Sequence, residues 1–311
     1  MISKDSKIYI AGHRGMVGSA CWRALTETGY TNLIGKTSKE LDLKDQSAVE
    51  DFIRSEKPGA IIDAAARVGG ILANDTYPYE FLMDNMLIQN NLIRSAHEND
   101  IEKFIFLGSS CIYPKHAKQP LKEEYLLTAP LEPTNEWYAI AKISGVKLIE
   151  SIRKQFGRDY VSLMPTNLYG PNDNFDLKTS HVLPAMIRKF HEAKMDNHSS
   201  VTLWGSGSPM REFLHVDDLA SAVVFALQNT LDEHLYNVGS GSDLTIKSLA
   251  EMVQKIVGHK GEIIWDDTKP DGTPRKLMDS YKLNTLGWKS KVSLDSGIQH
   301  FYSWFLNSKT F

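Results

Sequence analysis

The sequence contains only two cysteines, Cys21 and Cys111, among 311 residues. Two thiols are too few for the disulfide framework of a secreted domain, so we expect both to be reduced. The polar first residues also lack the long apolar region of a signal peptide. Together these features predict a cytoplasmic protein.

Long apolar runs and an excess of one charge are missing as well. The most apolar early stretch, residues 60–73, is broken by Asp63 and Arg67, so no membrane association is predicted. Lys and Arg number 35 against 38 Asp and Glu, a formal net charge of −3. This balance argues against a nucleic-acid partner, although a local basic pocket could still bind an anionic small molecule. The sequence indicates no metal site.

Short apolar runs alternate with helical patterns along the first half of the chain. Strands are predicted at 7–11, 32–35, 60–65, 104–107 and 161–164, and helices at 19–28, 46–56, 81–99 and 135–156. This alternation is typical of a parallel sheet that is covered by helices on both faces. The predicted fold class is therefore α/β, a Rossmann-type doubly wound parallel sheet.

After Pro171 the pattern changes to shorter strands between helices. Helices are predicted at 184–193, 217–228 and 244–257, and strands at 201–204 and 262–265. We predict a Rossmann domain of residues 1–170 with a return segment 213–238. Residues 171–212 and 239–311 would form a smaller C-terminal α/β substrate domain.

A glycine-rich loop connects the first predicted strand to the first predicted helix. It consists of Gly12, His13, Arg14, Gly15, Met16, Val17 and Gly18. Glycines allow backbone N–H groups to approach a pyrophosphate, and a helix N-terminus adds a favourable dipole. Such a spacing also occurs in ordinary strand–helix turns, but its position after the first strand favours a dinucleotide site.

The end of the second predicted strand indicates which dinucleotide binds. NAD-binding folds usually place an acidic residue there, whereas residues 34–39 contain two lysines and no carboxylate. Lys36, Lys39 and Arg14 together favour a 2′-phosphate and hence NADP(H). The alternative is that the two lysines only keep a loop solvated.

Tyr138 and Lys142 are four residues apart on a predicted helix and therefore share one face. A neighbouring ammonium lowers the pKa of a phenol, so this pair could exchange a proton with a carbonyl or alcohol near neutral pH. Ser109 follows a predicted strand at the edge where ligands bind in doubly wound folds. Its hydroxyl could donate a hydrogen bond to the reacting oxygen.

These motifs together resemble the extended short-chain dehydrogenase/reductase superfamily, and within it the GDP-L-fucose synthase family. The stretches that carry the resemblance are residues 11–20, 108–114, 164–171 and 270–276. The resemblance implies a GDP-linked 4-keto-6-deoxy sugar, GDP-4-keto-6-deoxy-D-mannose, as substrate. It also implies 3,5-epimerisation followed by NADPH-dependent reduction at C4.

Inversion at two carbons requires proton transfer on both faces of the sugar, so two acid/base groups are expected. The resemblance assigns Cys111 and His181 to these roles, and Tyr138, Lys142 and Ser109 to the reduction. Without the resemblance, Cys111 would be interpreted as a small buried apolar residue and His181 as a loop histidine or helix cap. Cys21, in the first predicted helix, is expected in the core.

The resemblance implies further ligand contacts. For the cofactor they are Ser38, Asp42, Leu107, Gly108, Lys142, Pro165, Asn167, Leu168 and His181. For the substrate they are Asn167, Lys189, Trp204, Arg211 and Asp271, with Arg275 as a further cation. Each substrate contact has an alternative interpretation: Trp204 could be core, Lys189 a solvated helix residue, and Asp271-Gly272 an ordinary turn.

Other functions stay open at this point. One is a 4-reductase without epimerisation, and another is an epimerase that acts on a different nucleotide sugar. A third is a redox sensor or scaffold that has lost catalysis, but such proteins usually lose the tyrosine–lysine pair. The resemblance also implies a homodimer that forms through the predicted helices 81–99 and 135–156.

Overall fold

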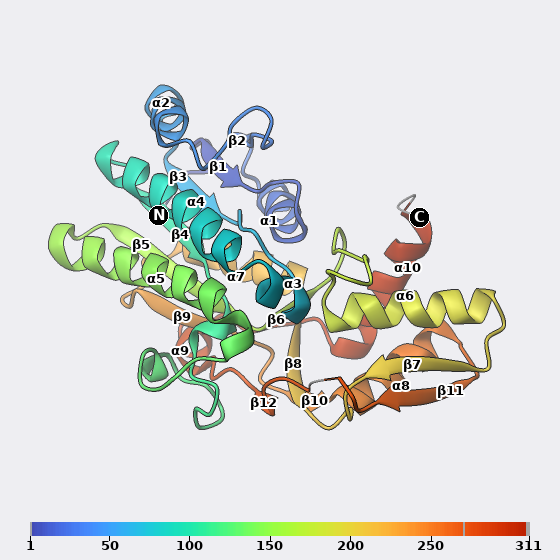
Figure 1. Ribbon diagram of the computed structural model, residues 1–311. Helices are drawn as coiled ribbons and strands as arrows, with labels where there is room; N and C mark the ends of the chain where they lie inside the picture. Colours follow the sequence, from blue (N-terminus) through green and yellow to red (C-terminus); the bar gives the residue numbers. More distant parts are fainter. Residues whose placement is uncertain (1, 270, 309–311) are drawn as a thin grey trace.

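The chain is built around a six-stranded sheet in which every neighbouring pair of strands is parallel (Figure 1). The computed structural model describes residues 2–269 and 271–308. In spatial order the strands are β2 (Leu33–Ile34), β1 (Ile8–Ala11), β3 (Ala60–Asp63), β4 (Lys103–Leu107), β5 (Asp159–Pro165) and β9 (Leu235–Val238). The predicted doubly wound parallel sheet is confirmed.

Helices cover both faces of this sheet. One face carries α1 (Met16–Glu27) and α7 (Val216–Gln228), which pack against each other. The opposite face carries α2 (Gln46–Glu56), α4 (Pro78–Glu98) and α5 (Glu136–Phe156). Successive strand residues alternate between the two apolar clusters, as the strand period of two requires.

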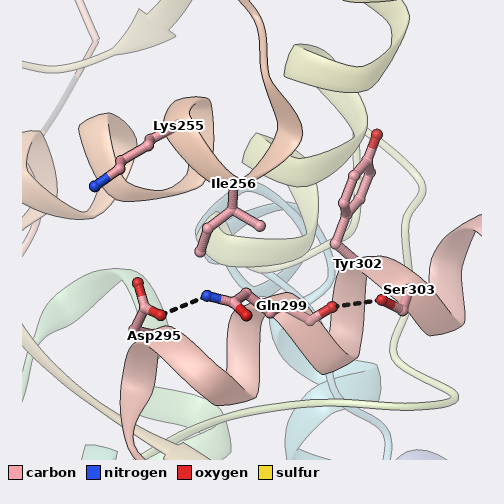
Figure 2. Close-up of a pocket in the computed structure, with 6 residues that line it drawn as sticks. All are labelled: Lys255, Ile256, Asp295, Gln299, Tyr302 and Ser303. Carbon is pink, nitrogen blue, oxygen red and sulfur yellow. Dashed lines mark hydrogen bonds between the residues drawn. The ribbon is translucent and has the colours of Figure 1, made fainter.

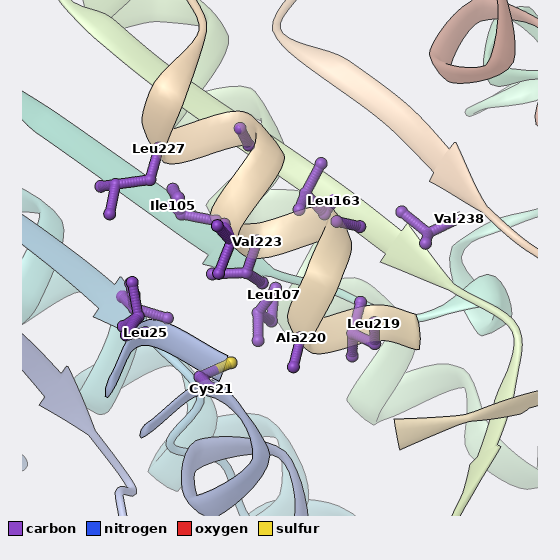
Figure 3. Close-up of a cluster of buried hydrophobic side chains, with 14 of the residues drawn as sticks. Cys21, Leu25, Ile105, Leu107, Leu163, Leu219, Ala220, Val223, Leu227 and Val238 are labelled. Atoms are coloured by element: carbon purple, nitrogen blue, oxygen red, sulfur yellow. The ribbon is translucent and has the colours of Figure 1, made fainter. Parts of the chain in front are cut away.

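The cluster between the sheet and helices α1 and α7 is shown in Figure 3. Cys21 is fully buried in it, which confirms its predicted place in the core, and burial raises the pKa of its thiol to about 12. Helix α7 is followed by β9 beside β5, so the chain returns to the large sheet as the sequence indicated. The predicted division into two domains stays a prediction.

The remaining elements form two smaller sheets around a separate apolar cluster. One joins β10 (Asp243–Thr245), β8 (Met210–His215), β12 (Arg275–Lys276) and β6 (Asn167–Tyr169). The other pairs β7 (Ser200–Trp204) with β11 (Glu262–Asp266). The helices that contribute to this cluster are α6 (Val182–Met195), α8 (Ile246–Val257) and α10 (Leu294–Asn307). Two short helices, α3 (Ile71–Thr76) and α9 (Tyr281–Thr285), are not part of it.

Several boundaries differ from the predicted ones. The helix predicted from residue 244 begins at Ile246, because the Thr245 side chain accepts from the Ser248 N–H and caps it. Strand β8 and helix α10 were not predicted. Within residues 2–269 and 271–308, no helix has both the length and the apolar character that crossing a membrane requires.

The α7 face of the core gives the first testable prediction. Leu227 is fully buried there, so Leu227→Ala should lower the free energy of unfolding by about 2–5 kcal/mol through lost burial and a cavity. Leu306 on α10 is 54% exposed, and Leu306→Ala should change the free energy of unfolding by less than about 0.5 kcal/mol. Urea denaturation measures the free energy of unfolding of both variants. Equal losses of this free energy would contradict the assignment of Leu227 to the core.

Candidate functional site

The candidate site lies at one edge of the large sheet, where the carboxyl ends of its parallel strands meet. Strand β1 ends at Ala11 before the glycine loop, and β3 ends at Asp63. Strand β4 ends at Leu107 before Ser109 and Cys111, and β5 ends at Pro165. The parallel pairing therefore brings sequence-distant motifs to the same edge.

The glycine loop leaves a helix N-terminus open to a ligand. Gly12 has a φ of +75°, and a Cβ on it would lie 2.8 Å from the Ala64 carbonyl oxygen, so a side chain there would be strained. Helix α1 begins after Gly15 with no side-chain cap and no acidic residue in its first turn. Its first N–H groups and its dipole are therefore available to an anion, and this geometry fits a pyrophosphate.

Of the cations predicted for the 2′-phosphate, Lys36 and Lys39 lie beyond β2, and Arg14 lies in the glycine loop. Hydrogen bonds from Thr37 lower the pKa of the Glu40 carboxylate most. The charges of Lys36 and Arg14 lower it further. The sequence analysis missed Glu40, which accepts from the Thr37 N–H at 2.7 Å and so fixes the turn. Lys39 is exposed.

Lys142 is a buried charge of the site. Its side chain is buried, and its Nζ donates a 2.9 Å hydrogen bond to the Leu107 carbonyl at the end of β4. The Nζ lies 4.7 Å from the Phe106 ring centroid and 5.9 Å from that of Tyr138. Burial lowers the pKa of Lys142, whereas Asp63 and Cys111 raise it.

Tyr138 differs from the sequence-based expectation in its acidity. We expected Lys142 to lower the pKa of this phenol, but burial raises it, with further contributions from Cys111 and Asp63. Tyr138 is therefore a neutral phenol at physiological pH. A neutral phenol is suited to donate a proton, which is what reduction of a ketone requires.

Ser109 and Cys111 lie in the short 3₁₀ turn Ser110–Ile112 and its cap, directly after β4. The Ser109 hydroxyl accepts from the Cys111 N–H at 3.4 Å, and it also forms a side-chain hydrogen bond that lowers the pKa of the thiol. Cys111 is buried, and burial raises its pKa overall. Lys276 and Lys142 act in the opposite direction, because their charges stabilise a thiolate.

Lys276, on β12, is a site residue that the sequence analysis missed. Burial lowers its pKa, and its charge interacts with Cys111, Arg211 and Glu132. The motif around residues 270–276 contained this lysine, but nothing in the spacing indicated that its charge acts on Cys111. Pro270, the first residue of that motif, lies outside the described residues.

His181 lies at the N-terminus of α6 with no side-chain capping bond. His181 as a whole is exposed to solvent. The protein atoms around its imidazole nevertheless lower the pKa of the ring by desolvation. A neutral imidazole is therefore the dominant form at neutral pH. Within the described residues no hydrogen bond or ion pair ties its ring to Cys111 or Tyr138, so its partnership with them stays a prediction.

The predicted substrate residues form a second cluster beside the first. Trp204 is 56% exposed, which excludes the core alternative for this side chain. The Nζ atoms of Lys189 and Lys269 lie 5.9 and 5.7 Å from its ring centroid. An accessible indole between two cations is suited to a base or ribose next to phosphates.

Arg211 and Asp271 join this cluster to the catalytic group. Asp271 accepts from the Ser206 N–H and hydroxyl at 2.8 and 2.7 Å, so it fixes the loop after Trp204. Its carboxylate raises the pKa of Arg211, although burial lowers that pKa overall. Arg211 also acts on Lys276, and Lys276 acts on Cys111, so electrostatic interactions connect the two clusters.

Other predicted contacts are less distinctive. Asn167 on β6 donates to the Glu212 carbonyl at 2.8 Å, and the Leu107 carbonyl accepts from Lys142. The cation expected at Arg275 is engaged, because its guanidinium forms a two-pronged ion pair with Asp243. The cofactor contacts predicted for His13, Ser38, Asp42, Gly108, Pro165 and Leu168 stay predictions.

Two other features lie away from this convergence. The depression in Figure 2 lies between α8 and α10 and is lined by Lys255, Ile256, Asp295, Gln299, Tyr302 and Ser303. None of these was predicted to contact a ligand. His215, Asp217 and His300 bring donor atoms within 4.8 Å of one another, but Asp217 is already paired with Arg23.

Comparisons with known proteins show the family of this chain. Residues 8–239 match the NAD dependent epimerase/dehydratase family. The chain is similar to GDP-L-fucose synthase 1 of Arabidopsis thaliana, at 58% identity over 99% of this chain and 95% of that protein. It is 54% identical to the GDP-L-fucose synthase of Escherichia coli (strain K12), over 97% of each chain.

A solved structure shares the whole architecture. It is a GDP-mannoheptose C4 reductase from Campylobacter jejuni with NADP bound. The TM-score is 0.90 at 39% sequence identity, and the match covers 98% of this chain and 100% of that one.

The position of Lys276 gives a prediction for thiol chemistry. Lys276→Met should raise the pKa of Cys111, because it removes the largest charge effect that favours the thiolate. Alkylation of Cys111 by iodoacetamide at pH 8, followed by peptide mass spectrometry, should slow about 3- to 10-fold. The neighbouring variant Arg275→Gln removes an exposed cation that faces Asp243 and should leave the rate unchanged. Equal rates in both variants would remove Lys276 from the site.

Proposed function

Because the chain belongs to the NAD dependent epimerase/dehydratase family, and within it to the GDP-L-fucose synthases, we propose that it converts GDP-4-keto-6-deoxy-D-mannose to GDP-L-fucose. The reaction comprises epimerisation at C3 and C5 and NADPH-dependent reduction at C4. The observation that carries this proposal is the convergence of Cys111, Tyr138 and Lys142 at the end of β4.

NADP(H) would be held by the glycine loop, which includes Arg14, and by Lys36 beyond β2. The open N-terminus of α1 receives the pyrophosphate, and Gly12 lets the loop pass close to the Ala64 backbone, which a Cβ would prevent. Arg14 and Lys36 supply positive charge where a 2′-phosphate is expected. When bound, the reduced cofactor supplies the hydride for C4.

In the reduction, Tyr138 donates its proton to the C4 oxygen. Its raised pKa keeps that proton in place until the oxygen becomes basic. Ser109 orients the same oxygen with its hydroxyl. Lys142, fixed by the Leu107 carbonyl, stabilises the phenolate that remains after the proton has moved.

In the epimerisation, Cys111 and His181 exchange protons with C3 and C5, which the neighbouring ketone makes acidic. A thiol and an imidazole both titrate near enough to neutrality to give or take a proton. Lys276 and Lys142 stabilise the thiolate form of Cys111. The GDP portion would bind at Lys189, Trp204, Arg211 and Asp271, with the Arg211 guanidinium on the diphosphate.

A second candidate is C4 reduction without epimerisation, because the similar Campylobacter jejuni structure is named a C4 reductase. Its discriminating feature is proton exchange at the carbons beside the ketone. The sugar product, identified by NMR after incubation with substrate and NADPH, separates the two functions.

Two variants test the assigned roles. Tyr138→Phe should reduce NADPH oxidation at least ~100-fold, because the proton donor is lost, while deuterium from D₂O still enters C3 and C5. Cys111→Ser should reduce that deuterium incorporation by a similar factor and leave NADPH affinity unchanged. Normal NADPH oxidation by Tyr138→Phe, or normal exchange by Cys111→Ser, would refute the respective role.

We also propose a homodimer that forms through α4 and α5, which pack side by side. Tyr79, Met83 and Leu87 are spaced by four residues on α4 and expose 68%, 40% and 37% of their surface. Trp137 and Ile140 of α5 are exposed as well. A contiguous apolar stripe of this kind is typical of a protein interface.

Light scattering after size exclusion tests the dimer. The unchanged protein should have twice the mass of the 35.0 kDa chain, and Met83→Glu should reduce it to one chain by burying a charge in the interface. Met195→Glu, at a 64% exposed site on α6, should leave the mass unchanged. A monomeric unchanged protein would refute the proposal.

We also propose a location and a division into domains. The unpaired state of both cysteines supports the cytoplasm as the place of action. The separate apolar clusters on the large sheet and around α6, α8 and α10 support the division into cofactor and substrate domains.

A further inference from the structure

One buried charge at the sheet edge has no role in the mechanism above. Asp63 is the last residue of β3 and is fully buried in the middle of the large sheet, between β1 and β4. Its Oδ1 accepts from the Ala65 N–H at 3.2 Å. Its Oδ2 has no hydrogen-bond partner within the described residues, although a buried carboxylate oxygen normally requires one.

The strand alternation places this carboxylate on the face that carries α5. Ile61 belongs to the apolar cluster beneath α5, and Ile62 belongs to the cluster on the opposite face. Asp63 therefore points toward α5. Its register partner on β4 is Phe106, and the Lys142 ammonium lies 4.7 Å from the centroid of that ring.

The charged and titratable groups that face Asp63 come from two elements. Lys142 and Tyr138 face it from α5, and Tyr9 faces it from β1. The carboxylate raises the pKa values of all three, while Lys142 lowers the pKa of Asp63. Cys111 belongs to the same group, because it interacts with Lys142 and Tyr138.

We infer that Asp63 is a positioning residue for the reduction: its carboxylate balances the Lys142 ammonium beside the Tyr138 phenol. This inference rests on the proposed reductase function. Without the carboxylate, the ammonium 5.9 Å from the Tyr138 ring would be uncompensated, and the pKa of this phenol would fall, because Asp63 is one of the groups that raise it. Burial raises the pKa of Asp63 to about 6, so the balancing charge is present at neutral pH and is lost below that value.

The first test is the pH profile of NADPH oxidation by Asp63→Asn. The alkaline limb of kcat should move to lower pH by about one unit, because the phenolate of Tyr138 forms more readily. Asp232→Asn makes the same change at an exposed position and should leave the profile in place. An alkaline limb that stays within about 0.2 pH units in folded, active Asp63→Asn would overturn the inference.

The second test needs neither substrate nor cofactor. The pKa of Asp63 is raised above the ordinary 3.8, so this group makes the protein less stable as the pH rises from about 4 to about 6. Lys142→Met removes the charge that lowers this pKa, so the loss of stability should extend to higher pH. Thermal unfolding of the cofactor-free protein and of Lys142→Met, from pH 4 to 8, measures the shift.

The two tests separate the two hypotheses. If no variant oxidises NADPH, but the pH range over which stability is lost shifts in Lys142→Met, the proposed function fails. The electrostatic coupling between Asp63 and Lys142 then still stands. If this pH range is the same in the unchanged protein and in Lys142→Met, Asp63 and Lys142 are not coupled and the inference is overturned. The stability comparison uses no Asp63 variant, so it decides the coupling even if Asp63→Asn does not fold.

Discussion

The site depends on one buried ammonium, that of Lys142, held by the carbonyl oxygen at the end of β4. Burying this charge is unfavourable, and the protein offsets the cost with groups that arrive from different parts of the chain. The carbonyl belongs to β4 and Asp63 to β3. Tyr138 lies on α5, the same helix as Lys142, one turn earlier. The parallel sheet is what brings these groups within reach of one charge.

This arrangement explains which parts of the site were predictable from the sequence. The helix spacing placed Tyr138 and Lys142 on one face, and the glycine loop followed directly from its position after a strand. Helix α2 was predicted with its observed bounds, 46–56, because Pro58 marks its end, and the structure adds an Asp45 cap at its start. Each of these features is local, so a short window of sequence contains the physical information.

The missed residues, by contrast, depend on long-range pairing. Lys276 reaches Cys111 because β12 adds to β8, and β8 itself was not predicted. Asp63 was interpreted as a polar interruption of an apolar stretch, since the strand alternation alone does not say that α5 places a lysine on that face. The acidity of Tyr138 was predicted with the wrong sign for the same reason. Its shift is governed by burial, which a sequence window does not contain.

The pKa directions also constrain how one site can support two kinds of chemistry. Burial keeps Cys111 as a thiol and Tyr138 as a phenol, and desolvation keeps His181 as an imidazole, so all three begin uncharged. Loss of a proton from Cys111 or Tyr138 creates an anion in a poorly solvated site, whereas His181 becomes a cation when it accepts one. Lys276 and Lys142 lie where they stabilise a thiolate, and Lys142 lies where it stabilises a phenolate. The lysines thus act on the states that form during the reaction rather than on the resting groups, which is where charge stabilisation accelerates a proton transfer.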